Sequence, residues 1–277
     1  MEINNQLIAQ DIQIALAEDI GSGDVTANLL PDDLYMHGII LSREPLVVCG
    51  QPWANAVFAS IDSEIRVTWL ADEGDYLDAP STLCKIHGSA RSLLTAERTV
   101  LNFIQTLSGT ASTTRSYVQK LVGTNVRLLD TRKTIPGLRL AQKYAVRCGG
   151  GFNHRLGLHD AFLIKENHIK ACGSITGAIK SARALNSSLL IEVEVVDLIE
   201  LNEALDASPD RILLDNFTVD MMLEAVSCGR KRRCQLEVSG GINLDNICQV
   251  AATGIDFISV GALTKSVRAI DLSLLLE

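Results

Sequence analysis

The amino-acid sequence predicts an α/β protein whose larger part is a β/α barrel. From Val126 onward, short apolar segments alternate with helical segments at intervals of roughly 20 to 35 residues, which is the rhythm of βα units in a parallel sheet. Each apolar segment ends on a polar, charged or glycine position, as expected where barrel strands lead into active-site loops. The preceding region, 38–88, contains short β-rich segments separated by turns and predicts a small α/β layer of its own.

The barrel interpretation depends on six predicted strands. They span residues 126–130, 161–164, 189–195, 211–215, 235–241 and 256–261. A doubly wound sheet would also bind ligands at its strand ends, but the first strand is not followed by the GxGxxG turn of a dinucleotide-binding fold. We therefore prefer the barrel.

The first 112 residues predict two amphipathic helices around the β-rich region. The helices are expected at 8–17 and 92–107, and the small and polar residues at 108–112 are typical of a hinge or domain crossing. The second helix carries Glu97 and Arg98 at helical spacing from its leucines, which predicts that both charges face the apolar side. Such charges must pair with each other, reach an interface or contact a ligand.

Composition excludes several classes of protein. The 277 residues carry a net charge of -8 and are 47% hydrophobic, which suits a globular protein and disfavours one that coats nucleic acid or a membrane surface. The seven cysteines are scattered without a CxxC pair, which favours a reducing cytoplasm. No apolar run approaches the length of about 18 residues that a membrane helix needs.

A basic stretch at 128–168 reverses the acidic character of the chain. Its cationic and histidine side chains surround Gly149-Gly150-Gly151 and include Arg132, Lys133, Arg139, Lys143, Arg147, His154, Arg155, Lys165 and His168. Arginine forks and lysine point charges beside closely approaching backbone predict a site for a multiply charged anion. The alternative is a solvated basic face, but Arg132, Lys133 and Lys165 each follow a predicted strand.

Carboxylates converge on the same predicted strand ends. Glu192 and Glu194 alternate with apolar residues and therefore share the inward face of their strand, and Asp215 ends the next strand. Such carboxylates beside phosphate-binding groups suit Mg²⁺. Salt bridges to Arg132 or Lys165 are the alternative.

The last two predicted strands run through glycine into helices. Ser239-Gly240-Gly241 follows one strand, and Gly261-Ala262 follows the other. Glycine lets backbone N–H groups approach a ligand, and barrels often hold a phosphate at this place. Each glycine pattern alone would be an ordinary turn, but their succession favours phosphate binding.

Taken together, these motifs resemble the quinolinate phosphoribosyltransferases, the carboxylating nicotinate-nucleotide pyrophosphorylases. The resemblance spans nearly the whole chain, and it is carried by AEDIGSGDVT, AERTVLNFIQTLSGTAS, DTRKTIPGLRLAQKYAVRCGGGFNHR, FLIKENHI, IEVEV, LLDN, EVSGGI and ISVGALTKS. It implies an incomplete barrel of six or seven strands at 108–266. It also implies an α/β sandwich domain at 1–107, joined by a C-terminal helix at 267–277. Family members convert quinolinate and phosphoribosyl pyrophosphate to nicotinate mononucleotide, CO₂ and pyrophosphate with Mg²⁺, as dimers whose active sites lie at the interface.

The resemblance also assigns expected roles to residues. Thr131, Arg132, Lys133, His154, Arg155 and Lys165 are expected around the quinolinate carboxylates and adjoining phosphates, and Arg98 is expected to enter from the neighbouring subunit. Glu194 and Asp215 are expected on the metal and ribose side, and with Lys133 and Lys165 they form the expected catalytic set. The expected 5′-phosphate cradle comprises Ser239, Gly240, Gly241, Val260, Gly261 and Ala262.

Three alternatives stay open at this point. One is the ModD-type branch associated with molybdate transport, against which the intact FNHR and KENH motifs speak. Another is a paralogue that uses nicotinate. The third is a silent anion-binding protein on the same scaffold, which the presence of Lys165, Glu194 and Asp215 disfavours.

Overall fold

The structure is a computed structural model that describes residues 5–277, and the chain divides into two compact units. Unit 1 contains the chain up to Arg115 together with residues 135–150 and 266–277. Unit 2 contains residues 116–134 and 151–265. Helix α3 (Ala90–Lys120) begins in unit 1 and ends in unit 2.

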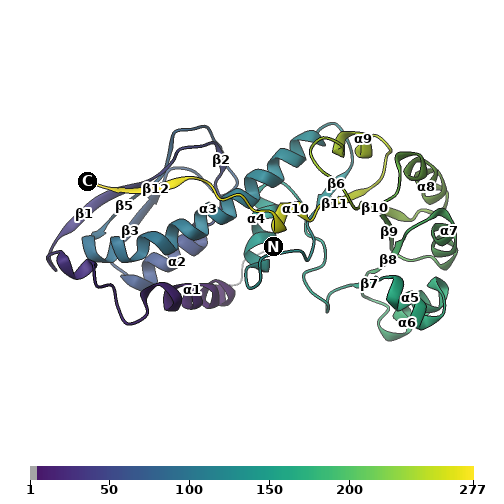
Figure 1. Cartoon of the computed structure of the whole chain (residues 1–277), viewed down its shortest axis with the longest axis horizontal. Helices are drawn as coiled ribbons and strands as arrows, with labels where there is room; N and C mark the ends of the chain where they lie inside the picture. Colours follow the sequence, from purple (N-terminus) through teal and green to yellow (C-terminus); the bar gives the residue numbers. More distant parts are fainter. Residues whose placement is uncertain (1–4) are drawn as a thin grey trace. The chain divides into compact units, whose positions relative to one another are not determined.

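Unit 1 is built on an antiparallel sheet with the strand order β12-β1-β5-β3. The strands are β1 (Tyr35–Ser42), β3 (Arg66–Trp69), β5 (Ser81–Ser89) and β12 (Leu272–Leu276), and β2 (Leu46–Val47) pairs with β4 (Tyr76–Leu77) in a second, small sheet. The helices of this unit are α1 (Asn5–Ile20), the 3-10 helix η1 (Ala27–Leu29), α2 (Gln51–Ile61), the first part of α3, and α4 (Arg139–Cys148). Buried residues from the sheet and these helices share one hydrophobic core, and α2 and α3 run beside the sheet in Figure 1.

The segment 108–112 is part of helix α3, so the predicted hinge is wrong, whereas the predicted domain crossing is confirmed where the chain passes from unit 1 to unit 2 after Arg115. The small residues allow close contact instead of breaking the helix. A side chain at Gly109 would come within 2.2 Å of the Arg268 carbonyl oxygen. The Ser108 hydroxyl contacts the backbone of Cys49 at 3.0 Å, and the Ser112 hydroxyl accepts a hydrogen bond from the Val47 N–H at 2.8 Å.

The predicted C-terminal helix at 267–277 is also wrong, because this segment forms strand β12. Strand β12 pairs antiparallel with β1, from Gly38 opposite Leu276 to Ser42 opposite Leu272. Leu272 and Leu274 are buried while Leu275 is exposed, which is the two-residue period of a strand. Pairing with β1, more than 200 residues earlier in the chain, decides the conformation of this apolar run.

Unit 2 contains a parallel six-stranded sheet within the described residues, in the order β6-β11-β10-β9-β8-β7. The strands are β6 (Arg127–Leu129), β7 (Phe162–Ile164), β8 (Ile191–Val195), β9 (Arg211–Asp215), β10 (Gln235–Ser239) and β11 (Phe257–Ser259). The helices that begin in this unit are α5 (Glu166–Cys172), α6 (Ile175–Leu185), α7 (Leu198–Ala207), α8 (Val219–Arg232), α9 (Ile247–Ala251) and α10 (Ala262–Lys265). All six predicted strands are confirmed.

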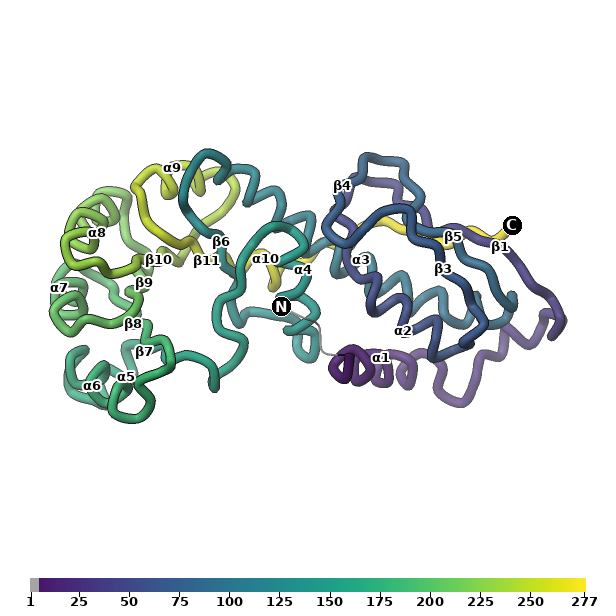
Figure 2. The backbone as a smooth tube through the Cα atoms, turned by 180° about the vertical axis from the view of Figure 1, so that it is seen from behind, coloured from purple at the N-terminus to yellow at the C-terminus, as the bar shows by residue number. Residues whose placement is uncertain are grey.

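The strands of unit 2 follow an arc, with α7, α8 and α9 on its outer side (Figures 1 and 2). Strands β6 and β7 are the two ends of the sheet and do not pair with each other, so the barrel is incomplete, as expected. Among residues 5–277, no helix combines the length and apolar character needed to cross a membrane.

Candidate active site

The carboxyl ends of the six parallel strands surround a cavity of about 720 Å³ in unit 2. Every predicted site residue except Arg98 lines this cavity. The fourteen are Thr131, Arg132, Lys133, His154, Arg155, Lys165, Glu194, Asp215, Ser239, Gly240, Gly241, Val260, Gly261 and Ala262. Positions far apart in the sequence meet here because parallel strands all end at the same edge of a sheet.

The buried carboxylate of Asp130, directly after β6, fixes the segment that carries His154 and Arg155. Its Oδ1 accepts a hydrogen bond from the His154 backbone N–H at 2.8 Å, and its Oδ2 accepts one from the Asn153 side chain at 2.6 Å. Asp130 is fully buried, so these two bonds hold the loop against the strand end. The cationic wall of the pocket is formed by Arg132, Lys133, Arg155 and Lys165, and Asp130 thus fixes the segment that carries one of the four, Arg155.

Lys133 occupies space that a glycine leaves open. A Cβ at Gly261 would lie 2.9 Å from Cδ of Lys133. The Thr264 hydroxyl donates to the Lys133 carbonyl at 2.7 Å, and the Lys133 N–H donates to the Thr131 hydroxyl at 3.0 Å. Glycine at position 261 therefore serves the placement of the lysine as well as the approach of a ligand.

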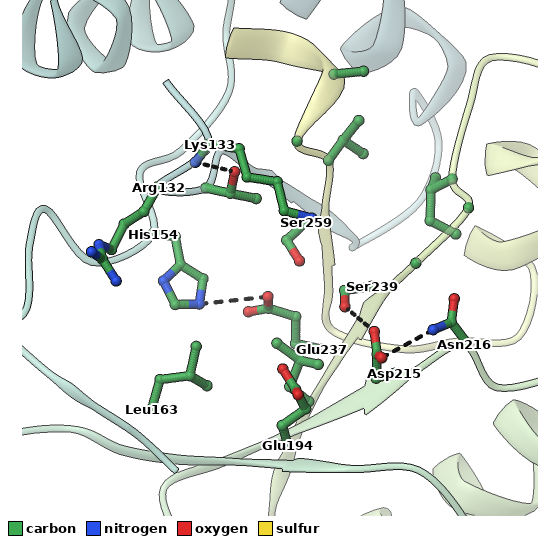
Figure 3. A pocket seen from close by; sticks show the side chains of 18 of the residues that line it. Arg132, Lys133, His154, Leu163, Glu194, Asp215, Asn216, Glu237, Ser239 and Ser259 are labelled. Atoms are coloured by element: carbon green, nitrogen blue, oxygen red, sulfur yellow. Dashed lines mark hydrogen bonds and ion pairs between the residues drawn. The ribbon is translucent and has the colours of Figure 1, made fainter. Parts of the chain in front are cut away.

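Both ring nitrogens of His154 lie close to protein groups, and Figure 3 shows the nitrogen that faces Glu237. Its Nδ1 accepts a hydrogen bond from the Arg155 backbone N–H at 2.7 Å, and its Nε2 lies 2.9 Å from Glu192 Oε2 and 3.5 Å from Glu237 Oε1. Because an N–H donates only to an unprotonated nitrogen, this hydrogen bond leaves the ring proton on Nε2, which faces the two carboxyl groups.

Lys165 follows β7 and forms an ion pair with Glu194 of β8. His168, whose role the sequence left open, caps helix α5: its Nδ1 accepts a hydrogen bond from the Lys165 N–H at 3.0 Å. This cap fixes the backbone from which the Lys165 side chain extends into the pocket.

Two carboxylates on neighbouring strands provide the oxygen-rich side of the pocket. Asp215 accepts hydrogen bonds from the Ser239 hydroxyl at 2.9 Å and from the Asn216 side chain at 3.0 Å (Figure 3). Glu194 contacts Lys165 and is more exposed than the buried Glu192. Hard carboxylate oxygens in an open pocket, with room for water and substrate oxygens, fit Mg²⁺.

The glycine turns differ from the expected helix-terminal cradle. Gly240 has φ +93°, and a Cβ there would lie 2.1 Å from the Asn216 side-chain oxygen. Gly241 has φ +63° and open space beside it, so only its backbone borders the cavity. Helices α9 and α10 have five and four residues, which makes any helix-dipole contribution small. Backbone N–H groups are what these turns offer an anion.

Part of the basic stretch lies elsewhere. Arg139, Lys143 and Arg147 belong to helix α4 in unit 1 and do not line the pocket. Gly149 also has a different role from the expected one, because its missing side chain allows contact with helix α3, where a Cβ would meet the Ala111 carbonyl at 2.4 Å. The prediction of one continuous cationic cluster around the three glycines is therefore wrong for α4.

Sequence reasoning missed four polar residues of the pocket: Asn216, Glu237, Ser259 and Lys265. Asn216 adopts φ +56°, which is uncommon outside glycine, and it contacts Asp215. Glu237 alternates with Leu236 and Val238, the same pattern that placed Glu192 and Glu194 inward, so the signal was present. Lys265 ends α10 and had no such signal.

Arg98 lies in unit 1, and its side chain is 60% exposed. Its guanidinium is 4.0 Å from Glu97 of the same helix. Leu94, one turn earlier, is exposed too, whereas Leu93, Val100 and Leu101 are buried. The predicted apolar environment of Arg98 is thus wrong within this chain.

Comparisons with known proteins agree on one family. The N-terminal domain of quinolinate phosphoribosyl transferase matches residues 24–108, and the C-terminal domain matches residues 110–275. The chain belongs to the quinolinate phosphoribosyl transferase family. A nicotinate-nucleotide pyrophosphorylase [carboxylating] of Mycobacterium leprae is 43% identical over 95% of both chains.

Solved structures of this family share the fold. The nicotinate-nucleotide pyrophosphorylase of Francisella tularensis has a TM-score of 0.97 and 49% identity, covering 100% of this chain and 98% of the other. That of Ehrlichia chaffeensis has a TM-score of 0.94 and 40% identity, covering both chains completely. Human nicotinic acid phosphoribosyltransferase is 10% identical with a TM-score of 0.65 and shares the fold alone.

Proposed function

We propose that this protein transfers a phosphoribosyl group to quinolinate and releases CO₂, forming nicotinate mononucleotide and pyrophosphate in NAD biosynthesis. One observation carries the proposal: the cationic wall, two carboxylates and two glycine turns line a single cavity in a member of this family. The ModD-type and non-catalytic alternatives receive no support from the comparisons, whose similar proteins carry the pyrophosphorylase name.

The cationic wall suits a planar dicarboxylate. Arg132 and Arg155 offer fork-shaped donors, and Lys165 adds a point charge beside Glu194. Burial, and after it the positive charge of the neighbouring Arg132, lowers the pKa of Arg155, so the two guanidinium groups repel each other. A ligand with two negative charges relieves that repulsion.

The opposite side suits a sugar phosphate. Backbone at Gly240, Gly241 and Gly261 borders the cavity and would hold the 5′-phosphate, while Lys133 would face the pyrophosphate. Glu194 and Asp215 would hold Mg²⁺, which when bound supplies positive charge to the leaving pyrophosphate.

The chemistry needs positioning more than acid-base catalysis. The pyridine nitrogen forms a bond to ribose C1 as the bond from C1 to the pyrophosphate oxygen breaks. The ring nitrogen is then positively charged, so it accepts the electron pair released when the adjacent carboxylate leaves as CO₂. The ring carbon finally takes up a proton. The wall residues hold the diacid in line with C1 throughout.

A dimer would complete the site. Arg98 is exposed on helix α3 and does not line the cavity of this chain, and we propose that it enters the pocket of a partner subunit. The seven cysteines are free thiols, in keeping with the proposed reducing cytoplasm.

The direct test incubates the purified protein with quinolinate, phosphoribosyl pyrophosphate and Mg²⁺ while pyridine absorbance and CO₂ release are followed. Turnover that requires all three components is expected. A parallel reaction with nicotinate separates the nicotinate paralogue, because only that alternative gives product without CO₂. Absence of turnover with quinolinate contradicts the proposal.

A further inference from the structure

A buried charged cluster lies beneath the cationic wall, formed by His154, Glu192, Arg211 and Glu237. Glu192 is 1% exposed and Glu237 is fully buried. Arg211 Nη1 lies 3.0 Å from Glu237 Oε2, and its guanidinium stacks over the Phe257 ring at 3.9 Å. Figure 3 shows the contact between His154 and Glu237 at the base of the pocket.

The cluster is costly for stability. Ionised carboxylates only accept hydrogen bonds, yet both Glu192 oxygens and Glu237 Oε1 make none among the described residues. The polar atom beside both carboxyl groups is Nε2 of His154, which lies 2.9 Å from Glu192 Oε2 and 3.5 Å from Glu237 Oε1. Burial raises the pKa of both carboxyl groups, that of Glu237 to about 7, and mutual repulsion adds to the shift at Glu237. Buried acids without hydrogen bonds in a folded protein call for a functional reason.

The buried cluster is connected to the cationic wall through His154, which lies beside both carboxyl groups and is hydrogen-bonded to Arg155. Arg155 donates its backbone N–H to His154 Nδ1, so the imidazole and the Arg155 backbone are fixed together. The Glu192 carboxylate also acts on the Arg155 guanidinium, because it raises the pKa of Arg155 against the lowering effect of Arg132. Glu192 therefore offsets the repulsion between the two arginines.

We propose that Glu192 and Glu237 are positioning residues for quinolinate: their carboxyl groups hold the His154 ring with its proton on Nε2, and the ring in turn holds the Arg155 backbone through Nδ1. Neither carboxylate needs to touch the substrate. The inference rests on the proposed function and extends it. It names the groups that position Arg155, one of the two arginines of the cationic wall, for binding of the quinolinate dianion.

Kinetics of two substitutions at Glu192 test the proposal. Glu192→Ala removes both the charge and the contact with His154, so we expect the KM for quinolinate to rise about tenfold or more, the scale of one lost interaction with a charged group. The KM for phosphoribosyl pyrophosphate should stay unchanged. Glu192→Gln keeps a polar oxygen beside Nε2, so the rise should be smaller.

Asp210→Asn is the matched control. Asp210 lies directly before β9, accepts a hydrogen bond from the Ile191 N–H at 2.7 Å and pairs with Arg183 at 2.8 Å, but it is not part of the pocket. Both KM values should equal those of the wild type. If Glu192→Ala lowers the melting temperature while both KM values stay unchanged, the cluster is merely structural and the proposal is overturned.

The ring proton of His154 gives a readout that is independent of turnover. Imidazole ¹⁵N shifts of the wild-type protein, assigned by the signal lost in His154→Asn, should show the Nε2–H tautomer, and Glu192→Gln should retain it. A proton on Nδ1 overturns the proposal even if the enzyme is active. If the wild type does not consume quinolinate, the proposed function fails, and these shifts still decide how His154 is held.

Discussion

Each unit of this molecule shields carboxylates from solvent, the partly buried Glu73 in unit 1 and the buried pair Glu192 and Glu237 in unit 2, and the two clusters of contacts around them differ. In unit 1, Glu73 Oε1 accepts hydrogen bonds from the N–H groups of Gly50 and Gln51 at 2.8 and 2.6 Å, and Oε2 accepts one from the Cys148 thiol at 3.7 Å. In unit 2, Glu192 and Glu237 have three oxygens without a hydrogen bond among the described residues.

This difference in hydrogen bonding distinguishes a carboxylate that supports the fold, Glu73, from carboxylates that serve the site, Glu192 and Glu237. Glu73 satisfies the first N–H groups of helix α2, so its bonds offset the cost of burying it. Glu237 lies beside the charge of Arg211 and both carboxyl groups lie near the Nε2 of His154, and they lie under a pocket that must accommodate anions. Removing a partner from the first cluster should change stability alone, whereas changes to the second should alter stability and substrate binding together.

The largest expected effect comes from Arg211→Ala. This substitution leaves Glu237 and Glu192 without the guanidinium that offsets their charge, which should cost about 3 to 5 kcal/mol of unfolding free energy, as for other broken buried pairs. The control is Arg183→Ala, which breaks an exposed pair with Asp210 and should cost only about 0.2 to 1 kcal/mol. Urea unfolding measures the unfolding free energy of both variants. Equal losses of unfolding free energy in the two variants would contradict the prediction.

The pH dependence of stability comes next. Because the pKa of Glu237 is raised from 4.5 to about 7, the native state keeps a proton that the unfolded chain releases. Its stabilising effect is therefore complete below pH 4.5 and is lost as the pH rises through about 7. The shift corresponds to about 3 kcal/mol at most.

Glu237→Gln isolates this contribution, since the amide does not titrate. The facing charged groups are His154, Glu192 and Arg211, and they remain in the variant. The unfolding free energy of the wild type minus that of the variant should decrease between pH 4.5 and 7.5. A constant difference across this range would show that Glu237 carries no extra proton.

Arg132→Ala tests the wall itself. Loss of a charge-assisted bidentate contact should cost roughly 1.5 to 3 kcal/mol of binding, or about tenfold to over a hundredfold in kcat/KM for quinolinate. The unfolding free energy should change far less, because the Arg132 Nε makes no hydrogen bond within the described chain. Near-normal turnover at low quinolinate would contradict the placement of Arg132.

The sequence predicted the parallel sheet because its strands are short apolar runs that end in polar residues, a local signal. The period of two placed Glu192 and Glu194 on one face, but it could not tell that Glu192 is buried and Glu194 borders the cavity. The burial of Glu192 depends on the neighbouring strands and on His154, which lies in a loop that is distant in the sequence. Strand β12 and the continuous helix α3 were missed for the same reason, since their partners are remote in sequence.

The smallest expected effect is at Glu73. Glu73→Gln keeps an oxygen for the N–H groups of Gly50 and Gln51 while removing the charge. Loss of that charge at the start of α2 costs about 0.3 to 1 kcal/mol, but burial raises the pKa of Glu73, so removing a poorly solvated charge opposes the loss. The unfolding free energy should thus change by less than about 1 kcal/mol, and both KM values should stay those of the wild type. Glu192→Gln is expected to raise the KM for quinolinate. If Glu73→Gln raises it too, the hydrogen-bonded Glu73 and the non-hydrogen-bonded Glu192 act alike, and hydrogen bonding does not distinguish structural from functional carboxylates in this fold.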